Sequence, residues 1–174
     1  MAHLSVGIGE MAASRHSDDI ISALGLGSCV ALIIFDARTG TVGFAHCMLP
    51  TASGGRMDEM GKPARYVDKG VQNLLKAMGV ARPRHTPLTS AIVGGAAMFE
   101  FNGPGMLDIG KQNVSMAQQM LQSQAIPVLK TEVGGNRGRS VTISVAELTV
   151  RVRDMEGQKD LVCFRRASVA GKAA

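Results

Sequence analysis

The stretch Leu24-Gly25-Leu26-Gly27-Ser28-Cys29-Val30 leads into an apolar run that continues to Phe35. The run is short and rich in β-branched residues, which is typical of a buried strand. The residues Arg38-Thr39-Gly40 supply a turn, and a second strand follows over Thr41-Val42-Gly43-Phe44-Ala45-His46. A hairpin of this kind can bring His46 close to Cys29, which lies at the start of the first strand.

Cys29 and His46 have the residue types of a thiolate nucleophile and the base that activates it. The two glycines and the serine before Cys29 leave the backbone with little side-chain cover, so the thiol can be reached. The backbone N–H of Cys29, beside Gly27 and Ser28, can hold the oxyanion of a tetrahedral intermediate, although these residues also suit a plain tight turn. The alternative for both candidates is structural, because a cysteine on an apolar strand is more often part of the core and a lone histidine more often has a structural role.

The composition predicts one folded domain with a mildly basic surface. With 174 residues, of which 45% are hydrophobic and 19% charged, the chain is long enough for one substantial core. We assign residues 1–166 to this domain and expect residues 167–174 to form a disordered tail. The net charge of +5 favours acidic partners. The Lys and Arg residues are scattered and lack interleaved aromatic residues, so we expect no nucleic-acid binding.

The three cysteines form no C-x-x-C pair, which fits a reducing cytoplasm without disulfides. Cys47 alternates away from His46 along its strand, and we assign Cys47 and Cys163 to the core. The chain has no stretch of about 20 apolar residues and no signal peptide, so we expect a cytoplasmic protein without membrane insertion. The remaining histidines have no partners at ligand spacing, so we predict neither a metal site nor a cofactor.

The hydrophobic patterns predict two helices among a larger number of short strands. Apolar residues recur at helical spacing over 63–78, which Pro63 opens, and over 111–124. Strands are expected at 3–9, 19–24, 30–35, 41–46, 89–93, 126–132, 140–145, 148–153 and 161–165, the last two forming a hairpin. Residues 11–19 are expected to cross the surface, and 51–62 and 96–108 to be mostly loop. Because several strands are sequential, we predict an α+β sandwich rather than a parallel doubly wound sheet.

The segments Gly25–Val30 and Ala45–Pro50, with Cys29 and His46 at the matching spacing, resemble the CheD family of chemoreceptor glutamine deamidases. Further matches in the family's order extend from about Leu4 to Arg165: Gly7-Ile8-Gly9-Glu10, Gly94-Gly95-Ala96-Ala97-Met98-Phe99, Ile109-Gly110 with Asn113, and Gly134-Gly135-Asn136-Arg137-Gly138-Arg139-Ser140-Val141. A lone Gly-Ser-Cys is a weak signal, whereas this set of motifs is specific. The glycines and arginines of the loop 134–139 also suit an anion site, but the P-loop pattern is missing and the resemblance favours a structural turn bordering the site.

The resemblance implies a mixed β-sandwich with helices packed against it, similar to the catalytic domain of cytotoxic necrotising factor toxins. It also implies hydrolysis of glutamine side chains to glutamate on the cytoplasmic region of methyl-accepting chemoreceptors, with Cys29 as nucleophile and His46 as base. The same acyl-enzyme would serve hydrolysis of a glutamyl methyl ester. The implied regulatory partner is CheC, a CheY-phosphate phosphatase, and we expect the chain itself to be a monomer.

The sequence departs from the family at Ala23, where family members usually have a threonine that orients the histidine as the third member of a triad. An alanine side chain cannot accept a hydrogen bond, and Ser22 would point to the opposite face of the strand. Ser28, Thr41 or a backbone carbonyl remain as candidate orienting groups. Ala23 therefore keeps a second hypothesis open, a CheD-like adaptor that binds receptors or CheC without turnover. A thiol hydrolase of small amides is a third, for which nothing specific speaks.

Overall fold

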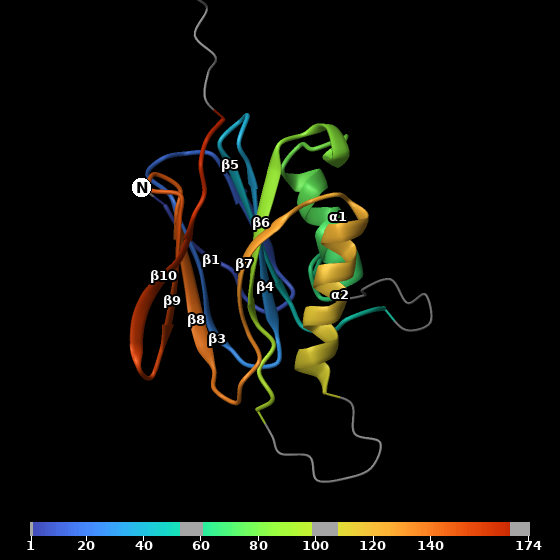
Figure 1. Cartoon of the computed structure of the whole chain (residues 1–174), viewed down its shortest axis with the longest axis vertical. Helices are drawn as coiled ribbons and strands as arrows, with labels where there is room; N and C mark the ends of the chain where they lie inside the picture. The colour runs from blue at the N-terminus through green and yellow to red at the C-terminus, as the bar shows by residue number, and fades with distance from the viewer. Residues whose placement is uncertain (1, 53–60, 99–107, 168–174) are drawn as a thin grey trace, which may run out of the picture.

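The chain folds into three layers, which are a five-stranded outer sheet, a five-stranded central sheet and a pair of helices (Figure 1). The computed structural model describes residues 2–52, 61–98 and 108–167. The outer sheet has the order β1 (His3–Ser5), β3 (Ile20–Leu26), β8 (Arg139–Ser144), β9 (Thr149–Asp154) and β10 (Gly157–Cys163). The central sheet has the order β2 (Met11–Ser14), β5 (Thr41–Cys47), β4 (Val30–Asp36), β6 (Leu88–Gly94) and β7 (Val128–Val133).

The helices α1 (Val67–Ala77) and α2 (Ile109–Ser123) cover the face of the central sheet that points away from the outer sheet (Figure 1). A short 3-10 helix, Pro83–His85, lies in the connection from α1 to β6. Within the described ranges, no helix is long and apolar enough to span a membrane.

Both faces of β4 are buried, which explains its uninterrupted apolar sequence. Ala31, Ile33 and Phe35 belong to the apolar cluster between the two sheets. The alternate residues of the strand, Val30, Leu32 and Ile34, belong to the cluster between the central sheet and the helices. A strand that is buried on both faces needs apolar residues at every position, so the apolar run that begins at Val30 indicates a central strand.

The predicted α+β sandwich and its main hairpin are confirmed. β4 and β5 pair antiparallel from Val30 with Cys47 to Asp36 with Thr41. The C-terminal hairpin is also confirmed, although its turn is shorter than expected, since β10 begins at Gly157. The first half of β10 is polar and exposed, so it gives no hydrophobic signal, and its pairing with β9 comes from the backbone.

Two predicted segments were wrong. Residues 11–19 were expected to cross the surface, but Met11–Ser14 forms β2 and pairs antiparallel with β5. Its residues have weak strand propensity, and the available edge of β5 overrides this preference. The helix expected from Pro63 begins only at Val67. Pro63 and Ala64 lie in a turn instead, and Tyr66 is extended. The carbonyl of Arg65 accepts hydrogen bonds from the N–H groups of Met48 and Leu49, which ties this segment to the chain after β5.

Three predicted segments extend beyond the described ranges. Residues 53–60 of the expected loop 51–62 and residues 99–107 of the expected loop 96–108 lie outside them. In the expected tail, residues 168–174 lie outside the described ranges as well. Ala167, the first residue of that tail, donates its N–H to the carbonyl of Ala37 at 2.9 Å.

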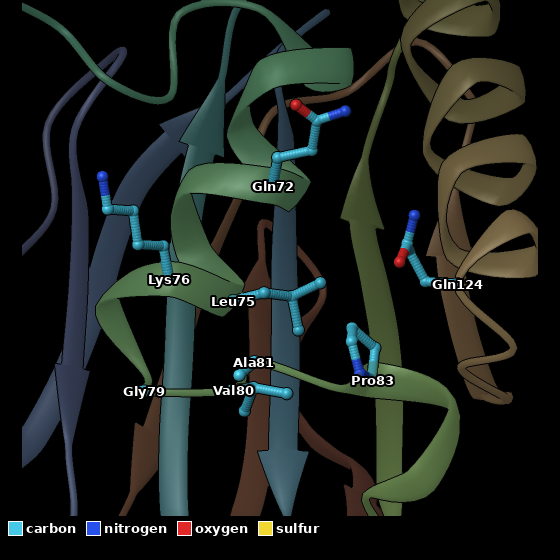
Figure 2. Close-up of a pocket in the computed structure, with 8 residues that line it drawn as sticks. All are labelled: Gln72, Leu75, Lys76, Gly79, Val80, Ala81, Pro83 and Gln124. Carbon is cyan, nitrogen blue, oxygen red and sulfur yellow. The ribbon is translucent and has the colours of Figure 1, made fainter.

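An open hollow of about 450 Å³ lies between the C-terminal ends of the two helices and the connector after α1 (Figure 2). Its lining includes the apolar side chains of Leu75, Val80 and Pro83. The connector leads into Leu88, which pairs with Asp36 at the end of β4 that is remote from Cys29. The lining of the hollow contains neither a cysteine nor a histidine, and we place the candidate active site at the other end of the central sheet, where Cys29 lies.

Candidate active site

The turn between β3 and β4 carries the Cys29 loop, which we define as residues 27–29 (lower end of the sheets in Figure 1). The loop is held through its carbonyls, since Gly95 N–H donates to Cys29 O and Ala96 N–H to Gly27 O, both at 2.8 Å. Gly94 allows this close approach, because its φ is +114° and a Cβ there would lie 2.3 Å from Cys29 O. The end of β6 at Gly94 and the two residues that follow it therefore fix the backbone that carries the thiol.

His46 lies on the same face of the central sheet as Cys29. In the β4–β5 ladder His46 pairs with Ala31, which is two residues after Cys29. Side chains alternate along a strand, so Cys29 and Ala31 share a face, and both pack in the cluster between the sheets. Cys29 and His46 are therefore diagonal neighbours. The Cα atoms of such neighbours lie about 7–8 Å apart, a distance that two side chains can span. The hairpin brings the two candidates together.

The imidazole of His46 is oriented by the backbone of the β1–β2 turn. His46 Nδ1 lies 3.1 Å from the carbonyl oxygen of Val6. A carbonyl oxygen only accepts, so Nδ1 carries the proton and Nε2 is the unprotonated nitrogen of the neutral ring. Nε2 is buried and has no hydrogen-bond partner among the residues that the structure describes. The nitrogen that can take a proton is thus left available.

The Val6 carbonyl supplies the hydrogen bond that Ala23 cannot make. Of the three candidate orienting groups, the structure shows the backbone carbonyl. Val6 is itself held in place, because its N–H donates to the carbonyl of Ser22 at 2.8 Å. The side chain of Ser22 points elsewhere and bonds to His3 Nε2, while the Thr41 hydroxyl bonds to Thr39. The ring of His46 is therefore oriented without a side-chain hydroxyl.

Burial keeps both reacting groups neutral in the resting protein. Burial raises the pKa of the half-buried Cys29 thiol, an effect that its own backbone N–H opposes. Burial also lowers the pKa of His46, while the bond to Val6 and the charge of Glu10 act in the opposite direction. At neutral pH the pair is therefore a thiol and a neutral imidazole, an arrangement in which the imidazole is able to accept the thiol proton.

The lowered pKa of His46 predicts the pH dependence of the activity if His46 is the base. Because burial disfavours the imidazolium, the neutral base persists to a pH below the ordinary histidine value of about 6.5. We expect the acid limb of kcat/KM for ammonia release to fall below that value, which a pH profile from about 5 to 9 will measure. An acid limb above about 7 would contradict a neutral His46 in the free protein.

The other two cysteines differ from each other. Cys47 is fully buried against the helices, as predicted, and burial raises the pKa of its thiol. The assignment of Cys163 to the core was wrong, because Cys163 is exposed at the end of β10. Its neighbours Val162 and Phe164 pack in the cluster between the two sheets, whereas Cys163 itself lies outside that cluster. The structure describes no group of three or more His, Cys, Asp or Glu residues that could hold a metal ion.

The loop 134–139 supports the segment that holds the Cys29 loop. Gly134 N–H donates to Gly94 O at 3.0 Å, and Gly135 O accepts from Ala97 N–H at 2.8 Å. The guanidinium of Arg139 donates to the carbonyls of Glu132 and Gly134, each at 2.6 Å. The other arginine of the loop, Arg137, is paired with Glu156 at 2.7 Å. With both arginines bonded to groups of the protein, the loop is a structural turn bordering the site rather than an anion site.

Sequence reasoning missed two residues at the site. Val6 acts through its carbonyl, which no side-chain pattern can reveal. Asn113 is fully buried in α2 and donates from Nδ2 to the carbonyls of Ser28 and Met48, each at 2.9 Å. In the sequence, Asn113 stands out only as part of a motif that matches the family, and the motif does not indicate what the residue does.

A family model described as CheD chemotactic sensory transduction matches residues 48–154. A protein of Thermotoga maritima, named chemoreceptor glutamine deamidase CheD, is 39% identical over 90% of this chain and 94% of its own length. Proteins of Pyrococcus horikoshii and Thermococcus kodakarensis, each named probable chemoreceptor glutamine deamidase CheD, are 36% and 35% identical. They cover 88% and 90% of this chain, and 93% and 95% of their own lengths are aligned.

Among solved structures, a Neisseria meningitidis protein of 13% identity aligns with a TM-score of 0.44 over 78% of this chain and 62% of that chain, which is too low to bear on fold or function. The family model, in contrast, matches more than half of the chain, although it begins after His46. The relatives cover nearly all of it, so their alignments include the segment from Cys29 to His46. The chain belongs to the CheD family.

Proposed function

We propose that the chain hydrolyses glutamine side chains to glutamate on the cytoplasmic region of methyl-accepting chemoreceptors. The observation that carries the proposal is the state of His46, with Nδ1 bonded to Val6 and Nε2 unpaired on the face that holds Cys29. A neutral imidazole beside a reachable thiol has the parts of a cysteine amidohydrolase. The relatives named chemoreceptor glutamine deamidase supply the substrate class.

The proposed reaction passes through a thioester. His46 Nε2 takes the thiol proton as Cys29 Sγ attacks the carboxamide carbon. The imidazolium then protonates the leaving nitrogen, and ammonia departs from the tetrahedral intermediate. Water, which gives its proton to His46, attacks the thioester, so that glutamate leaves and the thiol is restored. A glutamyl methyl ester can form the same thioester with methanol as the leaving group, so we include ester hydrolysis in the proposal.

The Cys29 loop also supplies a donor for the oxyanion. The carbonyls of Gly27, Ser28 and Cys29 all accept hydrogen bonds from residues of the β6–α2 side. The N–H of Cys29 belongs to the same residue as the thiol, so it lies close to the atom that attacks. A backbone N–H in this place is suited to the negative charge that develops on the carboxamide oxygen.

Exposed apolar side chains favour a macromolecular substrate. The described part of the chain exposes six large apolar side chains. Four of them lie on segments that carry Cys29 or His46 or that contact those segments. We call these four residues the apolar rim: Ile8, Leu24, Met48 and Met98. Leu24, which is 71% exposed, leads into the Cys29 loop, and Met98 packs on Gly27. Ile8 precedes Gly9, whose N–H donates to His46 O. A small free amide would leave such a rim unused, whereas a receptor helix can cover it.

Intact-mass analysis of a receptor cytoplasmic fragment tests the function. Each carboxamide that becomes a carboxylate adds about 1 Da, and we expect an equal amount of ammonia. Free glutamine and a short glutamine peptide, assayed in parallel, should react far more slowly because they cannot cover the apolar rim. Faster hydrolysis of the small amides than of the receptor would contradict the proposed substrate.

The second candidate is an adaptor that binds receptors or CheC without turnover. One observation favours it: within the described ranges no hydrogen bond joins Nε2 of His46 to the Cys29 thiol. A receptor fragment that binds but keeps its mass would establish this alternative. In either case we propose that CheC, where present, competes with the receptor for binding to the apolar rim. We also propose that the protein is a monomer and is cytoplasmic.

A further inference from the structure

The side chain of Asn113 joins the two backbone segments that carry the reacting pair. Its Nδ2 donates to the carbonyl of Ser28 and to the carbonyl of Met48, each at 2.9 Å. Ser28 directly precedes Cys29, and Met48 follows His46 by two residues. Asn113 is fully buried in α2, so the helix holds the amide in place between these two segments.

The bridge stands where the ladder between β4 and β5 stops. The pair of Val30 and Cys47 is the last one in the register. Beyond it, the N–H groups of Met48 and Leu49 donate to Arg65 O instead of to β4. The β4–β5 ladder therefore includes His46, through its pair with Ala31, but it ends one residue short of Cys29. The NH2 group of Asn113 replaces the missing bonds, with one carbonyl from each strand end.

The chemistry of the amide fits this role better than a packing role. An NH2 group has two donors, and the two carbonyls use both. Oδ1 of the same side chain is buried and has no partner in the part of the chain that the structure describes. A buried polar atom without a partner is unfavourable, and a leucine would fill the space without it. The two bonds to Ser28 and Met48 are thus the reason that the structure gives for an asparagine here.

We propose that Asn113 is a positioning residue, which sets the distance from Cys29 Sγ to His46 Nε2 by tying together the backbones that carry them. The inference rests on the Cys29–His46 mechanism proposed above. Asn113 touches neither the substrate nor the reacting atoms. Without the bridge, Gly95 and Ala96 still hold the Cys29 loop, but the hydrogen bonds that link this loop through Asn113 to the segment after β5 are lost. A misplacement of about 1 Å can lower a rate by about 10²-fold.

Two variants and a matched control test the proposal in kinetics. Asn113→Leu removes both donors and keeps an apolar side chain of similar size, and Asn113→Asp keeps the shape while removing the NH2 group. We expect kcat for receptor deamidation to fall roughly 10- to 100-fold in each, with KM changed by less than about threefold. Leu121→Val, which alters another fully buried residue of α2 outside the bridge, should leave kcat per folded molecule unchanged.

Alkylation of Cys29 by iodoacetamide supplies a readout that a packing role would not move. Cys163 is exposed and is replaced by serine in every protein, while Cys47 is buried. In the wild-type protein, alkylation of Cys29 near neutral pH should be accelerated by neutral His46. Both Asn113 variants should lose this acceleration, as the His46→Ala variant does. If a thermal melt shows that Asn113→Leu does not fold, the kcat and the alkylation rate of the isosteric Asn113→Asp variant test the proposal.

The two readouts separate this inference from the proposed function. A wild-type protein that leaves the receptor unchanged, but whose alkylation depends on both His46 and Asn113, would refute the deamidase and support the positioning role. A folded Asn113 variant with kcat within about twofold of wild type and the wild-type alkylation profile would overturn the positioning role. Alkylation that is independent of His46 in the wild type would overturn it as well.

Discussion

Replacing Cys29 with alanine is expected to abolish ammonia release from a receptor fragment and to leave the fold intact. In the proposed mechanism the Cys29 thiol forms the thioester, and the described part of the chain offers no substitute, since Cys47 is fully buried and Cys163 lies at the end of β10. The Cys29 loop is held through backbone carbonyls, which an alanine keeps. The free energy of unfolding should therefore change by no more than about 1 kcal/mol, which a thermal melt will check.

Two further substitutions give this experiment its controls. Cys163→Ala removes an exposed cysteine and should retain full activity. Cys29→Ser keeps the shape of the side chain but has a hydroxyl, which ionises far less readily than a thiol, so it should be inactive as well. Ammonia release that persists in a folded Cys29→Ala protein would remove Cys29 as the nucleophile. Receptor binding that survives without turnover would separate the docking surface from the chemistry.

The sequence predicts the centre of the fold better than its edges. β4 is buried on both faces, so its apolar run is unbroken, and the turn residues before β5 make the hairpin readable. β2 and the first half of β10 lie at sheet edges, where backbone pairing rather than side-chain burial defines the strand. The start of α1 depends on hydrogen bonds from Met48 and Leu49 to Arg65, contacts between distant segments that no local pattern contains.

The candidate site shows the same division between side chains and backbone. Cys29 and His46 are visible in the sequence because their chemistry is in their side chains. The group that orients His46 is a main-chain carbonyl, so the residue type at position 6 carries no signal of it. Ala23 draws attention as a missing hydroxyl, although the structure provides the hydrogen bond from Val6 instead. The assignment of Cys163 to the core was wrong because the apolar residues around it mark a strand, but the sequence does not show that this strand lies at the edge of its sheet, where a side chain can stay exposed.

Replacing His46 with alanine is expected to lower kcat for deamidation by roughly 10²-fold or more at neutral pH, which is typical for the loss of a general base. Burial raises the pKa of Cys29, so at neutral pH the thiol does not ionise without a base. Activity of the variant should therefore recover in part as the pH rises toward and above the ordinary cysteine value of about 8.5, where hydroxide removes the proton. The measurement is kcat against pH for wild type and variant.

A second variant separates the base from the hydrogen bond to Val6. His46→Gln offers an amide that can donate to that carbonyl but cannot take a proton, so it should be as slow as His46→Ala. His85→Ala is the matched control, because His85 is exposed near the opposite end of the central sheet and should leave kcat unchanged. Alkylation of Cys29 in the Cys163→Ser background should slow near neutral pH in both His46 variants and not in the control. Equal alkylation rates for wild type and both His46 variants at every pH would show that the imidazole and the thiol are not coupled, and the thioester mechanism would then need a different base.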